Sequence, residues 1–338
     1  MRFRVISLIL LVATLLAFGL HALRNDVSVA PDYPTRVISA TETEVTIEIP
    51  VGSTGSEIAQ LLFAQGVVKS SLAYFRAAVG DKRSEKTSPG AHRLSISISA
   101  AQALEQLLDP NRIPNLIRVF EGAWKSEIVE LMRQYGFSVN EINSGFRDAI
   151  LPSGFKNAEG LLFPAQYSFP KGTTATQVVQ AMINRFNSEK AGLDILAAQN
   201  QYSPLQLLTI ASIVQAEGDS ADFTKVARTI LNRLNISMPL QMDSTVHYIK
   251  RVRGEIFLST SSTLINSPYN TYKHYGLPPT PIGNPGADAL RAAINPSQGD
   301  WLYFITVAPG DTRFTASSAE FLVWKRLYEK NRLAGAFK

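Results

Sequence analysis

Apolar residues run from residue 5 to residue 23 with no charged side chain among them. A helix over this segment is about 28 Å long, close to the thickness of a bilayer's hydrocarbon core. Arginines flank it at positions 2, 4 and 24, and the first two place residues 1–4 in the cytoplasm under the positive-inside rule. The alternative is a cleaved signal peptide, but the run is longer than the usual signal core and no small-x-small site follows it. The pattern predicts a single-pass anchor through residues 5–23, with the body of the protein extracytoplasmic.

A strand-then-helix pattern next occurs twice, at a constant offset of 70 residues. Residues 46–67 and 116–137 share Gly-x3-Ser-Glu-Ile-x2-Leu-x4-Gly, which predicts a short strand, a turn and a helix closed by glycine. A fainter third copy lies at 167–182. There Thr174 and Gln177 have the spacing of a capping box, as Thr54 and Glu57 have in the first copy.

Further patterns extend these units into domains. A second helix at 72–79 and a returning strand at 93–98 complete a β-α-α-β module, with a surface loop at 81–89 and a hinge at 110–114. Beyond the hinge we expect helices over 177–189, 193–200, 204–217 and 221–235, a buried strand at 301–307 and a helix at 316–331. The sequence predicts an α+β protein with an anchor (1–24), a linker (25–44), a small module (45–112) and a larger mixed domain (113–338).

The helix predicted over 204–217 ends its apolar run with a carboxylate. At 3.6 residues per turn, one face of this helix carries Ile210, Ile213, Val214 and Glu217. The carboxyl group of Glu217 therefore lies on the apolar face, which we expect to pack against a core or line a cleft. Desolvation raises a carboxyl pKa and keeps the proton that a general acid donates. The alternative is that Glu217 lies at the mouth of a buried helix and points into water.

Composition and charge narrow the function. With 45% hydrophobic and 18% charged residues the chain is globular, and the absence of cysteine excludes disulfides, thiolate metal sites and cysteine nucleophiles. Only four histidines occur, without an HExxH pattern, so we expect no catalytic metal and no cofactor. The formal net charge is +5, of which three charges belong to the arginines around the anchor. The remaining +2, with no basic block, argues against a nucleic-acid partner.

Polar groups are dense between glycines and prolines after Glu217. Pro and Gly at this density hold loop shape, while amides, carboxylates and tyrosines supply the hydrogen bonds and stacking surfaces that sugar rings need. The alternative is an ordinary structured loop whose Asn and Asp side chains satisfy their own turns. The predicted groove is made by the segments 231–234, 240–246, 267–272, 276–279 and 281–286.

Taken in order, these segments resemble the endolytic murein transglycosylase family of MltG type. The resemblance rests on ASIVQAE (211–217), LNRL (231–234), LQMDSTV (240–246), SPYNTY (267–272), GLPPTPIGNPG (276–286) and AAINPSQGDWLYFI (292–305). Upstream, EGLLFPAQYSF (159–169) resembles the family's E-G-Y-L-F-P-D-T-Y element, and the 45–112 module resembles its LysM-like subdomain.

The resemblance implies a lytic transglycosylase of the inner membrane. Such enzymes cleave the β-1,4 bond between N-acetylmuramic acid and N-acetylglucosamine inside glycan strands and leave a 1,6-anhydro end. The substrate's own C6 hydroxyl is the nucleophile, so one acid suffices. That acid falls on Glu217; Gln241 and Asn270 are expected to bind N-acetyl or hydroxyl groups, Tyr269 or Tyr272 to stack, and Asp243 to orient the hydroxyl or cap a turn.

Several positions depart from the family pattern. Gln215 and Ala216 stand where Glu-Lys is usual, Ala165 and Gln166 replace Asp-Thr, and Ser244 replaces a Pro. Thr280 replaces a Gly, and the tail has Thr312-Arg313-Phe314 and Glu320-Phe321-Leu322 in place of H-x-F and E-H-N. These departures from the family pattern affect the periphery of the predicted groove.

Two other functions stay open from the sequence. A glycoside hydrolase would pair Glu217 with Asp243 or Asp219, because hydrolysis uses a second carboxylate. A non-catalytic glycan-binding scaffold would use the 45–112 module. The expected partners are peptidoglycan glycan strands, the membrane and, at family level, the cell-wall synthesis and division machinery that trimming of nascent strands would serve.

Overall fold

The computed structural model describes residues 30–39, 41–50, 52–114, 116–253 and 259–337. The chain divides into two compact units, one that ends at Pro114 and one that begins at Asn115. The membrane segment predicted at 5–23 lies outside the described residues. Within the described ranges, no helix has the length and apolar character needed to cross a bilayer.

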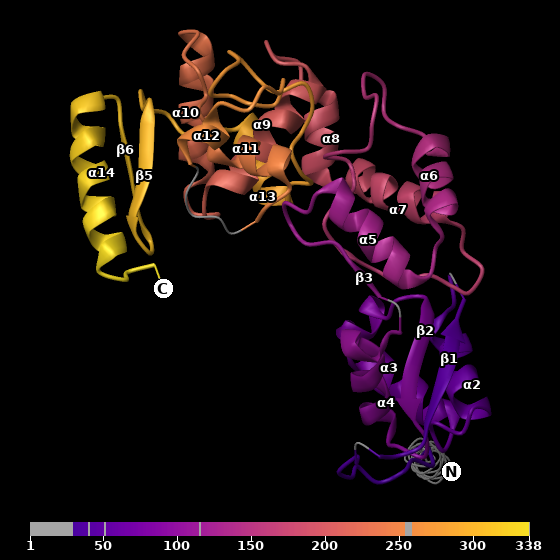
Figure 1. The fold of residues 1–338 in the computed structure, drawn as a ribbon. Helices are drawn as coiled ribbons and strands as arrows, with labels where there is room; N and C mark the ends of the chain where they lie inside the picture. Colours follow the sequence, from indigo (N-terminus) through magenta and orange to yellow (C-terminus); the bar gives the residue numbers. More distant parts are fainter. Residues whose placement is uncertain (1–29, 40, 51, 115, 254–258, 338) are drawn as a thin grey trace, which may run out of the picture. The chain divides into compact units, whose positions relative to one another are not determined.

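The N-terminal unit is a two-stranded antiparallel sheet covered by helices (Figure 1). Strand β1 (Glu44–Ile49) pairs with β2 (Gly90–Ser95) from Glu44 opposite Ser95 to Ile49 opposite Gly90. Between and after them lie α2 (Gly55–Ala64), α3 (Ser71–Gly80), α4 (Ala100–Leu108) and the short 3-10 turns Lys82–Lys86 and Pro110–Arg112. The β-α-α-β order agrees with the sequence pattern, α4 adds a third helix, and the likeness to LysM stays a prediction.

The repeated motif has a local physical function, which is to begin a helix. Thr54 and Glu57 form a capping box, and Thr174 and Gln177 form the same device before α7, as predicted. In the second copy the carboxylate of Glu127 accepts from the backbone N–H of Trp124 at 2.7 Å. The repeated Glu therefore satisfies a backbone donor that the first helical turn leaves free.

The second unit is mainly helical with two small sheets (Figure 1), which confirms the mixed α+β class. Its helices are α5 (Lys125–Tyr135), α6 (Val139–Asp148), α7 (Ala175–Ser188), α8 (Lys190–Ala197), α9 (Pro204–Glu217), α10 (Phe223–Asn235), α11 (Asp243–Lys250), α12 (Thr260–Thr263), α13 (Ala287–Ile294) and α14 (Ser318–Leu333). The sheets pair β3 (Ile117–Arg118) with β4 (Gln166–Tyr167), and β5 (Tyr303–Ala308) with β6 (Asp311–Thr315), all antiparallel.

The expected helices at 177–189, 193–200, 204–217 and 221–235 correspond to α7, α8, α9 and α10. The strand expected at 301–307 is present as β5, but its residues are half-buried apart from Val307. Its hairpin partner β6 and the helix α14 lie alongside it (Figure 1). The prediction of a buried strand was therefore wrong about burial, because the hairpin packs at the edge of the unit.

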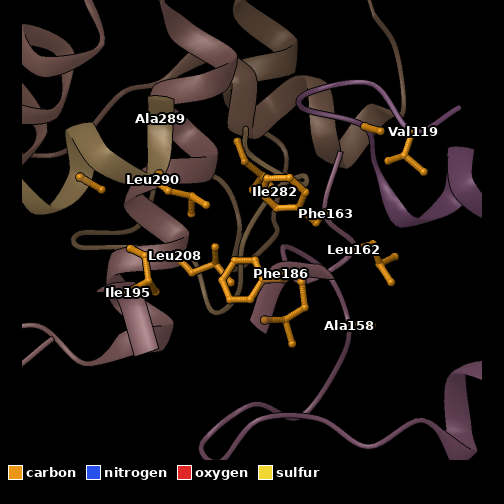
Figure 2. Packing of buried hydrophobic residues seen from close by; sticks show 14 of the residues in the cluster. Val119, Ala158, Leu162, Phe163, Phe186, Ile195, Leu208, Ile282, Ala289 and Leu290 are labelled. Atoms are coloured by element: carbon orange, nitrogen blue, oxygen red, sulfur yellow. The ribbon is translucent and has the colours of Figure 1, made fainter. Parts of the chain in front are cut away.

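Helix α9 is the centre of the core. Every residue from Leu207 to Val214 is buried, so the helix is apolar all round instead of carrying one apolar stripe. Figure 2 shows Leu208 of α9 among side chains of α7, α8 and α13, including Phe186, Ile195 and Leu290. The first and last turns of α9 leave this core, and the last turn places Glu217 at its edge.

Candidate active site

Glu217 is the last residue of α9 and faces the start of α11. Its Oε1 accepts a hydrogen bond of 3.0 Å from the backbone N–H of Ser244. Ser244 is the second residue of α11, where amides have no partner inside the helix and the helix dipole favours a negative charge. The carboxylate of Glu217 therefore accepts from a backbone N–H that has no partner within helix α11.

The surroundings of Glu217 favour its protonated form. Burial raises its pKa, and the carboxylate of Asp243 raises it further, while hydrogen bonding from Ser244 and the charge of Arg233 act in the opposite direction. Desolvation is the largest of these effects, so the carboxyl keeps its proton to a higher pH than a glutamate in water. Ser244 and Arg233, which favour the charged form, stabilise the carboxylate once the proton has left.

Asp243 and Tyr272 stand beside Glu217 in one network. The Tyr272 hydroxyl donates a short hydrogen bond to Asp243 Oδ1, and Asp243 begins α11 immediately before Ser244. Burial and the bond to Asp243 raise the pKa of Tyr272, which keeps its phenol neutral. The structure thus brings three of the predicted residues together, and Asp243 belongs to a helix although the sequence indicated a loop.

Gln241 is exposed next to this network, and its backbone lies in the left-handed region at φ 48°. Its N–H donates to Thr271 O at 3.1 Å, and the next amide, that of Met242, donates to Thr271 Oγ1 at 3.0 Å. The start of α11 is in this way tied to the 267–272 segment, with the Gln241 side chain free to face solvent.

Asn270 has no exposed surface. Its Nδ2 donates to Thr263 O at 3.0 Å and to Ile265 O at 2.8 Å, and its Oδ1 accepts from the N–H of Tyr272 at 3.0 Å. These bonds let Asn270 position the backbone of Tyr272, and its contact with substrate stays a prediction.

Tyr269 belongs to a second polar cluster. Its ring lies 5.2 Å from that of Tyr248 between centroids, and its hydroxyl is 2.7 Å from Thr280 Oγ1. It lines a cleft of about 650 Å³ together with Trp124 and Glu159. Of the two predicted stacking tyrosines, only Tyr272 lies at the Glu217 network.

Two charged residues of the site had no role assigned from the sequence. Arg233, in the LNRL segment of α10, is 6% exposed; it donates from Nε to Leu302 O at 2.6 Å and from Nη1 to Leu240 O. Its charge acts on Glu217. The signal in the sequence was a lone arginine within an otherwise apolar helix face.

Glu159, the first residue of EGLLFPAQYSF, is the second. It is 5% exposed, and its carboxyl accepts from Lys125 N (3.0 Å), Tyr248 Oη (2.9 Å) and Asn284 Nδ2 (3.2 Å). Burial raises its pKa to about 7 despite these donors. Glu159 joins the start of α5, the end of α11 and the 282–286 loop.

A hollow of about 220 Å³ adjoins the end of α9. Gln215, Ser244, His247 and Arg253 are among its lining residues, and His247 Nε2 is buried there without a hydrogen-bond partner among the described residues. Gln215 Oε1 accepts from Gly286 N at 2.9 Å, so the amide at this position anchors the 282–286 loop.

In the part of the chain that the structure describes, no three His, Asp or Glu side chains gather as metal ligands would.

Comparisons with known proteins agree on one group. The sequence profile of the YceG-like family matches residues 47–326. A protein from Bacillus subtilis (strain 168) named endolytic murein transglycosylase is 32% identical over 310 residues, 85% of this chain and 85% of that protein.

Two more distant likenesses point the same way. A Streptococcus pneumoniae serotype 2 protein of the same name is 28% identical over 304 residues, 77% of this chain and 54% of its own length, so the chain spans about half of it. A crystal structure of a YceG-like protein from Listeria monocytogenes has a TM-score of 0.56 at 26% identity and covers 82% of this chain and 98% of that one.

Proposed function

The chain belongs to the YceG-like family, and from this membership we propose that it is an endolytic murein transglycosylase with Glu217 as its general acid and base. Its substrate is the peptidoglycan glycan strand, and its products end in 1,6-anhydro-N-acetylmuramic acid. The single observation that carries the assignment to Glu217 is its placement: a carboxyl at the edge of the core, desolvated, and facing the free N–H of Ser244.

The first step uses the protonated acid. Glu217 donates its proton to the glycosidic oxygen while the bond from that oxygen to C1 of the muramic acid breaks. The raised pKa keeps this proton available, because burial penalises the charged form. As the proton leaves, the Ser244 N–H and the charge of Arg233 stabilise the new carboxylate.

The second step uses the same group as a base. The C6 hydroxyl of the muramic acid bonds to C1 through its oxygen, and its proton passes to the Glu217 carboxylate. No water is consumed and Glu217 ends as it began, which is why one acid is sufficient. Asp243, held by the Tyr272 hydroxyl, places a negative charge near the positive charge that develops at C1.

A retained second candidate is a glycoside hydrolase, since Asp243 lies close enough to affect Glu217. Of the two partners considered, Asp219 is exposed, and Asp243 already accepts from Tyr272. The scaffold reading has less support, because glycan binding alone does not require a desolvated acid.

The test is mass spectrometry of glycan strands digested in water enriched in oxygen-18. A transglycosylase yields anhydro ends without the heavy isotope, whereas a hydrolase yields reducing ends that carry it. Internal cleavage predicts intermediate fragment lengths early in the digest. Reducing ends labelled with oxygen-18 would contradict the proposal and indicate hydrolysis, with Asp243 as the first candidate for the second carboxylate.

The proposal extends to location. Residues 5–23 anchor the protein in the inner membrane with the catalytic unit outside the cytoplasm, where it trims or terminates nascent strands beside the synthesis and division machinery. The support is the apolar run and its flanking arginines. Protease accessibility in spheroplasts tests it: digestion of the body from outside is expected, and full protection would contradict it.

A further inference from the structure

The cleft of about 650 Å³ near Tyr269 is separate from the Glu217 network but adjacent to it. It lies between the start of α5 and the end of α11, and its lining residues include Trp124, Lys125, Glu159, Tyr248, Arg251 and Tyr269. Nothing in the proposed chemistry at Glu217 uses this space.

Its wall is aromatic and held in place. Tyr248 packs edge-on against Trp124 at 6.0 Å between centroids and lies 5.2 Å from Tyr269. The buried carboxyl of Glu159 accepts from the Tyr248 hydroxyl at 2.9 Å, which fixes the orientation of that ring. Trp124 is 8% exposed, and the guanidinium of Arg253 lies 4.1 Å from the centroid of its ring. The half-buried rings of Tyr248 and Tyr269 are therefore the surfaces suited to pack against the apolar face of a sugar.

Its charge is positive. Lys125 and Arg251 line the cleft. The Lys125 ammonium lies 4.3 Å from the centroid of the Phe146 ring, and neither cation forms an ion pair with a carboxylate in the part of the chain that the structure describes. The one acidic lining residue, Glu159, is buried and already accepts from Lys125 N, Tyr248 and Asn284. N-acetylated sugar rings are neutral, so the cations need a carboxylate partner that lies outside the rings.

The cleft borders the hollow at the end of α9. Trp124 lines both this cleft and the 220 Å³ hollow that Gln215 and Ser244 share at the end of α9. Ser244, Tyr248 and Arg251 are four and three residues apart along α11 and its C-cap, so they follow one face of the helix. The rise of about 1.5 Å per residue puts Arg251 roughly 10 Å beyond Ser244.

We propose that this cleft binds a muramyl unit next to the cleaved bond through its stem peptide, with Tyr248 and Tyr269 against the sugar and with Lys125 and Arg251 paired to the peptide carboxylates. The inference rests on the proposed function, since it names which part of the same substrate the cleft takes. It makes the enzyme selective for strands that still carry peptides.

The test measures binding instead of cleavage, in full-length protein carrying Glu217→Gln so that strands stay intact. Uncrosslinked glycan strands with stem peptides are compared with the same strands after amidase treatment, which leaves only the lactyl carboxylate on each muramic acid. We expect peptide-bearing strands to bind about fivefold to tenfold more tightly, and this advantage to shrink as salt rises, because it depends on ion pairs.

Lys125→Gln with Arg251→Asn should reduce that ratio to near one. Asparagine accepts the left-handed backbone of Arg251 (φ 54°), so the exchange removes charge without strain. Arg251→Glu alone should lower the ratio further than Arg251→Asn, and the matched control Lys156→Gln, an exposed lysine outside the cleft, should preserve it.

Equal affinity for both strands in the parent protein, or an unchanged ratio in the double variant, would overturn the proposal. So would an equal loss on both strands, which would mean that the cleft binds the sugar alone. Cleavage of amidase-treated strands by the unsubstituted protein is scored separately, so a failure of the transglycosylase assignment is distinguishable from a failure of this one.

Discussion

In the proposed mechanism, one backbone amide tunes the pKa of the acid. Ser244 supplies the N–H that holds Glu217, at a position where the related family usually has proline, which has no N–H to donate. Proline is tolerated in the first turn of a helix, so Ser244→Pro removes this donor while leaving α11 a permitted start.

Ser244→Pro should therefore raise the pKa of Glu217. Activity needs the protonated acid and falls as pH rises through this pKa, so the alkaline limb of the pH–rate profile should move to higher pH. A hydrogen bond to a charged group stabilises it by about 1.5–3 kcal/mol, which corresponds to about 1–2 pH units. The profile of kcat against pH measures the shift.

Ser244→Ala is the matched control, because it removes the hydroxyl and keeps the amide. The limb of the Pro variant should lie above that of the Ala variant. Coincident limbs would show that the amide does not tune Glu217.

The burial of a site residue was predictable only where an apolar pattern isolated that residue. Glu217 stood out because it ended a run that buries. The burial of Asn270 was not predictable, because an amide between Pro and Gly looks the same in sequence whether it faces a ligand or, as here, bonds to three backbone groups. Glu159 lies in a loop without periodicity, so nothing in the pattern indicated its burial.

At the scale of elements, the site is built by joining loops to helix ends. Asn284 is fully buried and connects three segments: Oδ1 accepts from Leu162 N at 2.8 Å, and Nδ2 donates to Ala123 O at 2.8 Å and to Glu159 Oε1 at 3.2 Å. The 282–286 loop, the start of α5 and the Glu159 loop are thereby held as one body.

Asn284→Ala should lower the free energy of unfolding by about 2–4 kcal/mol, because buried partners lose their hydrogen bonds. Urea unfolding followed by tryptophan fluorescence measures it. Asn140→Ala, an exposed position on α6, is the control and should change stability by less than about 0.5 kcal/mol. A loss no larger at Asn284 than at Asn140 would contradict this role.

Helices were predictable where length, apolar content and caps agreed, as in α7, α9 and α10. The short helices α11 and α13 lie among Gly, Pro and polar residues, and tertiary contacts decide them: α13 packs on α9, and the loop before it is bonded to the 121–124 segment. Local sequence periodicity does not predict such tertiary contacts.

At the scale of the molecule, two hydrophobic cores share no residue. One contains Ile47, Leu62 and Leu94 of the N-terminal unit, and the other surrounds α9. All three tryptophans, Trp124, Trp301 and Trp324, belong to the second unit. We expect an early unfolding phase, from the smaller core, that circular dichroism detects and tryptophan fluorescence does not.

This early phase should depend on pH through His92. The side chain is fully buried, with Nε2 2.8 Å from Ser88 O, and burial lowers its pKa despite Ser88 and Glu48. The unfolded state then binds more protons in acid, so stability is fully present above about pH 6.5 and falls as pH drops below it.

The midpoint of the early phase in urea, measured by circular dichroism from pH 7.5 to 5, tests this. It should fall with pH in the unsubstituted protein and hold nearly constant below pH 6.5 in His92→Gln. An identical pH dependence in both proteins would exclude His92 as its source.

In the proposed mechanism, Glu217 performs both proton transfers. The most direct measurement is the initial rate at which anhydro ends appear on glycan strands with the unsubstituted protein and with Glu217→Gln, which keeps the shape of the side chain and its bond to Ser244. We expect the rate to fall by about 10²–10⁴-fold with stability unchanged. A Glu217→Gln rate within a few-fold of the unsubstituted enzyme would contradict it.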